Sequence, residues 1–244
     1  MSRHAVQAAE RFDQWASTYG EDRMTRWFHH YQTVALSELD LEGGPGFLEV
    51  GCGTGWAVRQ AAKRIPSGFA CGIDISPLMI EKAASQLDNS ENVEFQVASS
   101  ESLPFGNETF QSILCSNSFH HYENPVRALR EIKRVLKPDG RFVLLDSARD
   151  VSLGVWLQDR MHRCFEKSHV RYYTTNEMAQ LLGDADWKFV GELLTIKKFM
   201  HHHKVFTGLM LAVCKKESDT SLHRTSDDIN RAAVAVLERE PDRN

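Results

Sequence analysis

The sequence predicts an α/β fold in which helices cover both faces of a mostly parallel sheet. Two observations support this prediction. Short apolar runs alternate with helical segments between residues 47 and 146, and a glycine-rich turn follows the first of these runs. The chain has 244 residues, of which 42% are apolar, so it can build one large domain with a sizeable core.

Seven apolar or β-rich runs are predicted as strands. The first is short, and it ends directly before the glycine-rich turn. The last two are joined by residues 197–204, a spacing that fits an antiparallel pair closing the sheet. The predicted strands are residues 47–50, 70–75, 93–97, 112–116, 141–146, 189–196 and 205–213.

Helices are predicted between these strands and before the first one. Ser76 is expected to cap a helix that begins at Pro77, and Thr174 or Thr175 to cap a later one. One N-terminal helical stripe consists of Phe12, Trp15, Ala16 and Tyr19. The predicted helices are residues 55–64, 77–87, 125–136 and 175–182, with two more before residue 40.

The chain is expected to consist of one domain, residues 1–216, and a polar tail, residues 217–244. Within the domain, residues 1–42 would form an N-terminal helical cap. Residues 147–173 interrupt the alternation of strands and helices, and they are expected to be an irregular helical insert. The tail could form a short helix over residues 226–240.

Charge and cysteine content exclude several classes of protein. Lys and Arg number 29 and Asp and Glu 33, a net charge of −4 that argues against a chain that mainly grips nucleic acid. The five cysteines are odd in number and contain no C-x-x-C pair, so no disulfide framework or cysteine zinc site is expected. No apolar run suggests a signal peptide or membrane span, so we expect a cytoplasmic protein.

The most informative segment is FLEVGCGTGW, residues 47–56. It places Gly51, Gly53 and Gly55 between a strand and a helix. Glycines permit a tight turn and let a ligand approach the backbone, and the helix N-terminus offers free N–H groups. A dinucleotide-binding G-x-G-x-x-G would need glycine at Trp56, and the lysine of a Walker loop is also missing. The turn therefore predicts a ligand site but argues against a nicotinamide dehydrogenase.

This segment resembles the first motif of class I methyltransferases that depend on S-adenosylmethionine (SAM), in which an acid stands two residues before G-x-G-x-G. Four more segments resemble family motifs in the same order: GIDIS (72–76), SESLPF (100–105), SNSFHH (116–121) and LREIKRVLKPDGRFVL (129–144). The similarity is greatest to the UbiE-like group. It implies SAM as cofactor and a Rossmann-like fold with a seven-stranded, mostly parallel sheet, an antiparallel last strand and a helical lid.

The resemblance also implies which residues bind SAM. Asp74 would accept hydrogen bonds from both ribose hydroxyls, and Glu49 would order the turn and the methionine end. Ile75 and Leu103 match positions that sandwich adenine, although Leu103 could equally belong to the core. Ser99 replaces the usual aspartate near the adenine amino group, so only an uncharged contact is expected there. The expected cofactor-binding residues are Tyr19, Glu49, Gly51, Cys52, Gly53, Gly55, Asp74, Ile75, Ser99, Ser100, Glu101 and Asn117.

His120 and His121 are the candidates for catalysis. Methyl transfer from a sulfonium is an in-line displacement, and a hydroxyl acceptor must also lose its proton, a task that suits histidine. One of the pair could instead only orient the loop, because many methyltransferases need no base. Three consecutive histidines at 201–203 lack the spacing of a metal site and are expected in a solvated turn, so no metal is predicted.

The insert would form, with the N-terminal helices, a lid that selects the acceptor. Its large residues either line an aromatic pocket or form a small core of the lid itself; they are Trp156, Phe165, Tyr172 and Tyr173.

The sequence therefore predicts methyl transfer from SAM to a small molecule. Two alternatives remain, namely methylation of a macromolecule and a SAM-binding regulator or inactive homologue. Asn117 is followed by serine rather than by an N-P-P-Y-like motif, which disfavours N-methylation of adenine, cytosine or glutamine. O, N, C and S acceptors are all compatible with the sequence, and so are a monomer and a homodimer.

Overall fold

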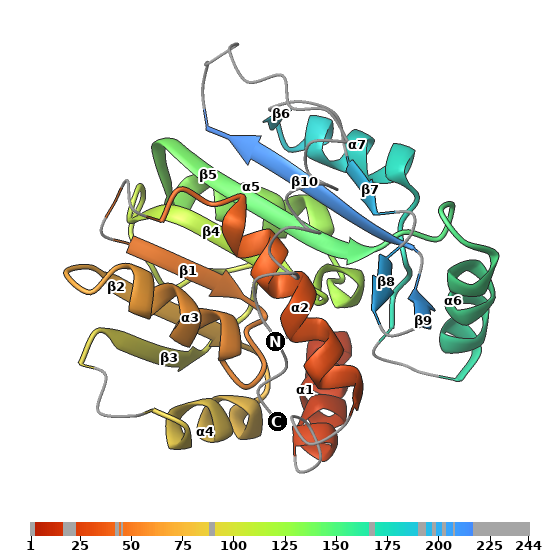
Figure 1. Ribbon diagram of the computed structural model, residues 1–244, viewed down its shortest axis with the longest axis horizontal. Coiled ribbons are helices and arrows are strands. Elements are labelled where there is room, and N and C mark those ends of the chain that lie inside the picture. Colours follow the sequence, from red (N-terminus) through yellow and green to blue (C-terminus); the bar gives the residue numbers. More distant parts are fainter. Residues whose placement is uncertain are drawn as a thin grey trace.

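A computed structural model describes most of the chain, and a single twisted sheet lies at its centre (Figure 1). The described residues are 3–16, 23–41, 44, 46–87, 91–165, 169–189, 194–196, 199–201, 204–206 and 208–216. The strands are β1 (Gly46–Val50), β2 (Phe69–Asp74), β3 (Val93–Val97), β4 (Phe110–Ser116), β5 (Leu136–Ser147), β6 (Lys188–Phe189), β7 (Leu194–Ile196), β8 (Phe199–His201), β9 (Lys204–Phe206) and β10 (Leu209–Lys215).

The central sheet has the order β3-β2-β1-β4-β5-β10-β6, with β7 also paired to β10. Strands β1 to β5 pair in parallel, and β10 pairs antiparallel with β5. The mostly parallel sheet with an antiparallel last strand is thus confirmed. The sheet has eight strands rather than seven because β6 and β7 pair with different stretches of β10, so both occupy one edge position.

Helices cover both faces of this sheet, as predicted. They are α1 (Arg3–Ala16), α2 (Arg23–Ser37), α3 (Trp56–Arg64), α4 (Pro77–Ser85), α5 (Pro125–Val135), α6 (Leu153–Phe165) and α7 (Thr175–Asp184), with a short 3-10 helix at Phe119–His121. Two of the predicted caps are confirmed. The Ser76 hydroxyl accepts a hydrogen bond from the Met79 amide, and Thr174 and Glu177 form a capping box on α7.

Alternate residues of the strands divide the core into two layers. On β5, Phe142 and Leu144 belong to the layer under α5 and α7, whereas Val143 and Leu145 belong to the layer under α2 and α3. This alternation follows from the two-residue period of a strand, and both sets are fully buried because a parallel sheet is covered on both faces. The continuous apolar runs in the sequence are therefore a consequence of two-sided burial.

Several predicted boundaries were wrong. Strand β5 begins at Leu136, not Arg141, because Leu136 already pairs with Phe110 ahead of a register shift in β4. The connection predicted as a loop forms a separate antiparallel hairpin of β8 and β9, which places His201 in a strand, and the last strand begins only at Leu209. The histidines at 202–203 and the tail at 217–244 lie outside the described residues.

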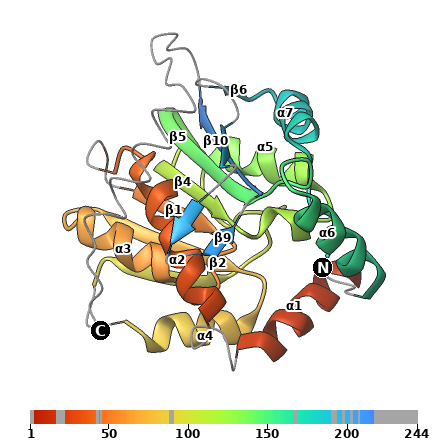
Figure 2. The same cartoon turned by 45° about the vertical axis from the view of Figure 1, so that its right-hand side comes forward.

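Two helices, α1 and α6, lie at the end of the sheet toward which the parallel strands point (Figure 1, Figure 2). Helix α2 runs across the sheet face beside α3, and its residues Phe28 and Gln32 reach the same end. In open parallel sheets, ligands bind at this carboxyl edge. None of the helices in the described part of the chain is long and apolar enough to cross a membrane.

The packing of the glycine turn can be tested at Gly55. Its φ is +73°, and a Cβ at this position would collide with the ring of Phe95. We expect Gly55→Ala to lower the free energy of unfolding by about 2–4 kcal/mol, from backbone strain and overpacking together. Chemical denaturation would measure this loss.

The matched control is Gly183→Ala in α7. A Cβ there would meet no atom within 4 Å, and its φ lies outside the left-handed range. This variant should gain up to about 0.5–1 kcal/mol from helix propensity. Equal effects of the two substitutions would contradict the packing role of Gly55.

Candidate active site

A single cavity of about 340 Å³ lies at the carboxyl edge of the sheet. Residues at or just after the carboxyl ends of β1 to β5 form its floor, and α1, α2 and α6 contribute to its walls. Most of the predicted SAM-binding residues line it, together with both candidate catalytic histidines. Those lining residues are Gly51, Cys52, Gly53, Asp74, Ile75, Ser99, Ser100, Glu101, Asn117, His120 and His121.

The glycine turn after β1 is fastened to the end of β2. The amides of Gly51 and Cys52 both donate to the carbonyl of Ile73, at 2.8 and 2.9 Å. The amide of Gly53 donates to Asp74 Oδ2 at 2.9 Å, and the amide of Ser76 donates to Asp74 Oδ1 at 3.0 Å. Burial raises the pKa of Asp74, although these hydrogen bonds lower it in part. Each carboxylate oxygen keeps acceptor capacity for a ligand, because a carboxylate offers about four lone-pair sites.

The three glycines of the turn have different structural roles. Gly51 has φ +77°, and a Cβ there would collide with the side chain of Ser118. Gly51 and Gly53 line the cavity, whereas Gly55 is not among the lining residues and caps α3 against Phe95. Tyr19 lies outside the described residues.

Glu49 lies beneath the cavity rather than in its lining. Its Oε1 accepts hydrogen bonds from Gln32 Nε2 at 3.2 Å and from Ser116 Oγ at 3.0 Å, and both of these residues line the cavity. Its Oε2 is buried and has no hydrogen-bond partner. Burial raises the pKa of Glu49 to about 8, so the carboxyl group is largely protonated at neutral pH.

The side of the cavity matched to adenine is lined by Ile75 and by Ser99 to Glu101. The Ser99 hydroxyl accepts a hydrogen bond from the Glu101 amide at 3.3 Å. Leu103 is 4% exposed and belongs to the core under α5, so its alternative assignment to the core is the one that the structure favours.

His120 is held by a buried carboxylate that sequence reasoning missed. Its Nδ1 lies 2.7 Å from Asp146 Oδ1, and its backbone amide donates to Asp146 Oδ2 at 3.0 Å. Asp146 is the penultimate residue of β5, is 1% exposed and also accepts from the Ser147 amide at 2.7 Å. These contacts fix the ring and place a proton on Nδ1, which leaves the lone pair on Nε2.

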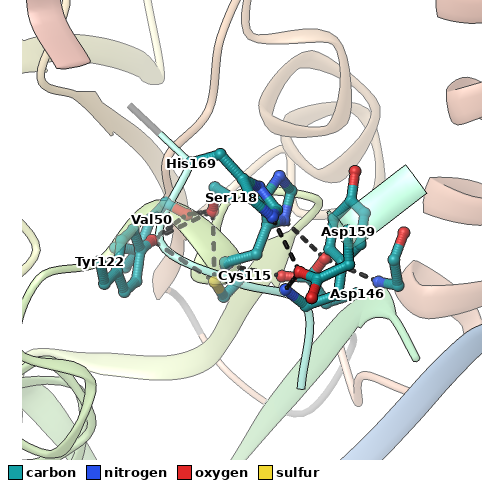
Figure 3. A network of polar contacts seen from close by, with 10 residues as sticks. Val50, Cys115, Ser118, Tyr122, Asp146, Asp159 and His169 are labelled. Carbon is teal, nitrogen blue, oxygen red and sulfur yellow. Dashed lines mark hydrogen bonds and ion pairs between the residues drawn. The ribbon is translucent and has the colours of Figure 1, made fainter. Parts of the chain in front are cut away.

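A third histidine joins the pair. His169 lies in the segment after α6, and its ring centroid is 5.5 Å from that of His120 and 6.1 Å from that of His121. Its Nε2 lies 3.0 Å from Oδ1 of Asp159, a buried residue of α6. Burial lowers the pKa of His169. Figure 3 shows His169, Asp159 and Asp146 in one network of polar contacts.

The same network reaches the glycine turn through the 3-10 helix. The hydroxyls of Ser118 and Tyr122 both donate to the carbonyl of Val50, at 3.1 and 3.2 Å, and both contact the thiol of Cys115 (Figure 3). The Cys115 thiol is fully buried, and burial raises its pKa to about 12. The loop that carries His120 and the turn that follows β1 are therefore one connected unit.

Helix α1 covers one side of the cavity. Asp13 Oδ1 accepts from the Ser76 hydroxyl at 2.5 Å and from the Leu78 amide at 3.1 Å, so α1 is tied to the start of α4. At its other end, His4 Nε2 donates to the carbonyl of His121 at 3.0 Å. Phe12 packs edge-on against the ring of His121, with 4.8 Å between the ring centroids. These contacts hold α1 against the cavity at both of its ends.

The insert contributes fewer aromatics to the cavity than its composition suggested. Tyr172 lines the cavity, and Tyr173 lies in the core at 1% exposed. Trp156 and Phe165 point outward and are 45% and 86% exposed. Polar residues of the insert were missed instead, namely Asp159 and His169. The signal in the sequence for Asp159 was an acidic residue within a helical segment rich in large side chains.

The burial of Glu49 predicts a specific pH dependence of stability. The folded chain keeps the proton up to about pH 8, whereas the unfolded chain releases it near 4.5, so this group costs stability increasingly as pH rises between those values. Glu49→Gln removes that cost and keeps an acceptor for Gln32 and Ser116. We expect the variant to exceed the wild type by on the order of 3 kcal/mol at pH 8.

Denaturant unfolding at pH 5 and pH 8 measures the effect. The advantage should shrink markedly at pH 5. The matched control is Glu94→Gln, at an exposed position on β3. An advantage of Glu49→Gln that is the same at both pH values would contradict the raised pKa.

Comparison with known proteins agrees with the motifs. Residues 48–144 match the family model described as a methyltransferase domain. The uncharacterized methyltransferase YcgJ of Bacillus subtilis is 35% identical over 134 residues, covering 53% of this chain and 52% of the relative. A demethylmenaquinone methyltransferase of Symbiobacterium thermophilum is 28% identical over 148 residues, covering 59% and 57%. The chain thus spans about half the length of these curated relatives.

The fold is shared with solved structures. The crystal structure of Bacillus subtilis YcgJ aligns with a TM-score of 0.64 at 23% identity and covers 78% of this chain and 100% of that chain. The matched domain, the fold and the ordered motifs agree. Residues 48–144 match the methyltransferase domain family, and the chain is similar to SAM-dependent methyltransferases, among them a demethylmenaquinone methyltransferase.

Proposed function

We propose that this protein transfers the methyl group of SAM to a small-molecule acceptor that binds beside His120. One observation carries the proposal. A single cavity joins the glycine turn and Asp74 at one end to His120 and His121 at the other. A methyl donor held by the first group and an acceptor held by the second would meet inside that cavity, as a displacement between two bound molecules requires.

The residues present fit SAM. Gly51 and Gly53 bring bare backbone to the cavity wall, and Gly51 leaves no room for a Cβ. Asp74 lines the cavity at a strand end and can accept two hydroxyl hydrogen bonds. Ile75 and Ser99 would hold the adenine. Glu49 would act through Gln32 and Ser116, which it positions in the cavity wall.

When bound, SAM supplies an electrophilic methyl group on a sulfonium cation. Aromatic side chains of the lid, Phe12 and Trp15 of α1 and Tyr172, line the cavity. Their faces would attract such a cation and keep water away from it. His120, with its proton on Nδ1 fixed by Asp146, presents Nε2 for the proton of a hydroxyl acceptor.

The size and cover of the cavity favour a small acceptor. Its volume of about 340 Å³ is within the range of small-molecule sites. Helix α1 lies over the site and is pinned at Ser76 and at His121, so a large acceptor would have to displace it. A relative named for demethylmenaquinone, itself a small molecule, supports the same choice.

The ribose contact can be tested at Asp74. We expect Asp74→Ala to weaken SAM binding by more than about tenfold, because a charge-assisted contact to two hydroxyls is lost. Isothermal titration calorimetry measures the affinity, and thermal unfolding of the same sample checks that the variant is folded. The matched control is Asp150→Ala. Asp150 accepts hydrogen bonds from the amide and hydroxyl of Thr175 and does not line the cavity. Unchanged affinity in the Asp74 variant would refute the assignment.

The function itself is tested with isotopically labelled SAM. The protein is incubated with methyl-labelled SAM and a small-molecule extract, and mass spectrometry searches for a new labelled species. We expect a labelled metabolite with the wild type and none with Asp74→Ala. Label only in protein or nucleic acid would establish a macromolecular acceptor. SAM binding without any label in either fraction would favour a SAM-binding regulator.

A further inference from the structure

Three histidines that are far apart in the sequence meet at the acceptor end of the cavity. His120, His121 and His169 each offer a ring nitrogen, and these three nitrogens lie within 4.8 Å of one another. The 3-10 helix supplies the first two, and the segment after α6 supplies the third. Nitrogens around a tetrahedral zinc ion lie about 3.4 Å apart, so modest rotation of the rings would bring the three into coordinating distance.

Two of these rings carry the supporting contacts that metal-bound histidines have. Metal ligands usually donate their second ring N–H to a carboxylate, which fixes the tautomer and makes the other nitrogen more basic. Asp146 occupies this position at Nδ1 of His120, at 2.7 Å, and Asp159 at Nε2 of His169, at 3.0 Å. Both carboxylates are buried, at 1% and 2% exposed. The remaining lone pairs are therefore those of His120 Nε2 and His169 Nδ1.

The second of these lone pairs has no partner. The side chain of His169 is fully buried, and its Nδ1 makes no hydrogen bond within the described chain. A buried polar atom that stays unpaired costs about 1–3 kcal/mol. Asp159 Oδ1 orients this ring and also accepts a hydrogen bond from the Tyr172 amide at 2.6 Å, whereas Oδ2 lies 3.8 Å from Arg163. An ion bound through His169 Nδ1 would satisfy this unpaired nitrogen.

We propose that His120, His121 and His169 bind a divalent transition-metal ion. Three neutral imidazoles suit zinc best among the common ions, although copper, nickel and iron also accept them. A zinc ion held by three histidines keeps a fourth position open, as in catalytic zinc sites. Here the open position would face the cavity, which His120 and His121 line.

The site narrows the class of acceptor, a step that rests on the proposed function. The open position would take an oxygen or sulfur donor of the acceptor, such as a phenolate, a carboxylate or a thiolate, and hold it toward the SAM end of the cavity. Zinc also lowers the pKa of a bound hydroxyl or thiol. With the ion present, His120 would serve as a ligand, and a hydroxyl or thiol bound at the open position would release its proton to solvent before it attacks the methyl group.

Metal binding is measured without turnover. The background chain carries His201→Gln, His202→Gln and His203→Gln, so that the run of three histidines cannot bind the added ion. Untagged protein is dialysed against a chelator and titrated with zinc by calorimetry and with cobalt by visible absorption. We expect one ion per chain and the absorption bands of a tetrahedral or five-coordinate cobalt site.

Variants identify the ligands. His169→Gln should weaken zinc binding by at least about 100-fold, and Asp159→Asn by about 10–100-fold, because the second loses only the orienting contact. The matched control is His29→Gln, since His29 stacks on Trp56 away from the cluster and should leave zinc binding unchanged. SAM affinity, measured on each sample, should be retained throughout.

The outcomes separate this proposal from the proposed function. Normal SAM binding without stoichiometric zinc would overturn the metal site and leave methyl transfer untouched. Zinc binding by the cluster without any methyl transfer would support the metal site and overturn the proposed function. If His169→Gln loses SAM binding as well, His121→Asn, at a partly exposed ring, decides the case, and zinc affinity unchanged in that variant would overturn the site.

Discussion

The hydrogen bonds between the glycine turn and the end of β2 are the constraint on which the site depends. The carbonyl of Ile73 accepts from two successive amides of the turn, and Asp74 accepts from a third. These contacts fix the path of the chain where β1 ends, and Ser118 then fits against the bare Cα of Gly51. Because Ser118 and Tyr122 also bind the carbonyl of Val50, the loop that carries His120 takes its position from the same turn. Both ends of the cavity are thus set by one local structure.

A parallel sheet also explains why so many acids gather in one place. Glu49, Asp74 and Asp146 lie at or near the carboxyl ends of β1, β2 and β5, and all three are nearly or fully buried. A buried carboxylate is costly unless it is hydrogen-bonded or neutral. Asp74 and Asp146 accept backbone amides, whereas Glu49 keeps its proton because burial outweighs the hydrogen bond from Ser116. The edge therefore contains one acid that burial keeps protonated and two acids that accept hydrogen bonds from backbone amides.

Local signals predicted the fold well because they reported on two-sided burial and on helix caps. The apolar runs identified the parallel strands, and Ser76 and Thr174 identified two helix starts. Predictions failed where pairing partners decide the outcome, as at Leu136, whose strand is defined by Phe110. The turn and Asp74 could be found in the same way, since the turn follows β1 directly and Asp74 is the last residue of β2. Asp146, Asp159 and His169 could not be found in this way. They come together only when β5 and the insert are folded against the loop at residue 120.

Asp159 connects α6 to the histidine end of the cavity. This residue belongs to α6, yet its Oδ1 accepts from His169 and from the amide of Tyr172, both in the segment that follows. The amide of Val170 in turn donates to the carbonyl of His120 at 3.1 Å. Movement of α6 would therefore pull on the ring of His169 and on the loop that carries His120.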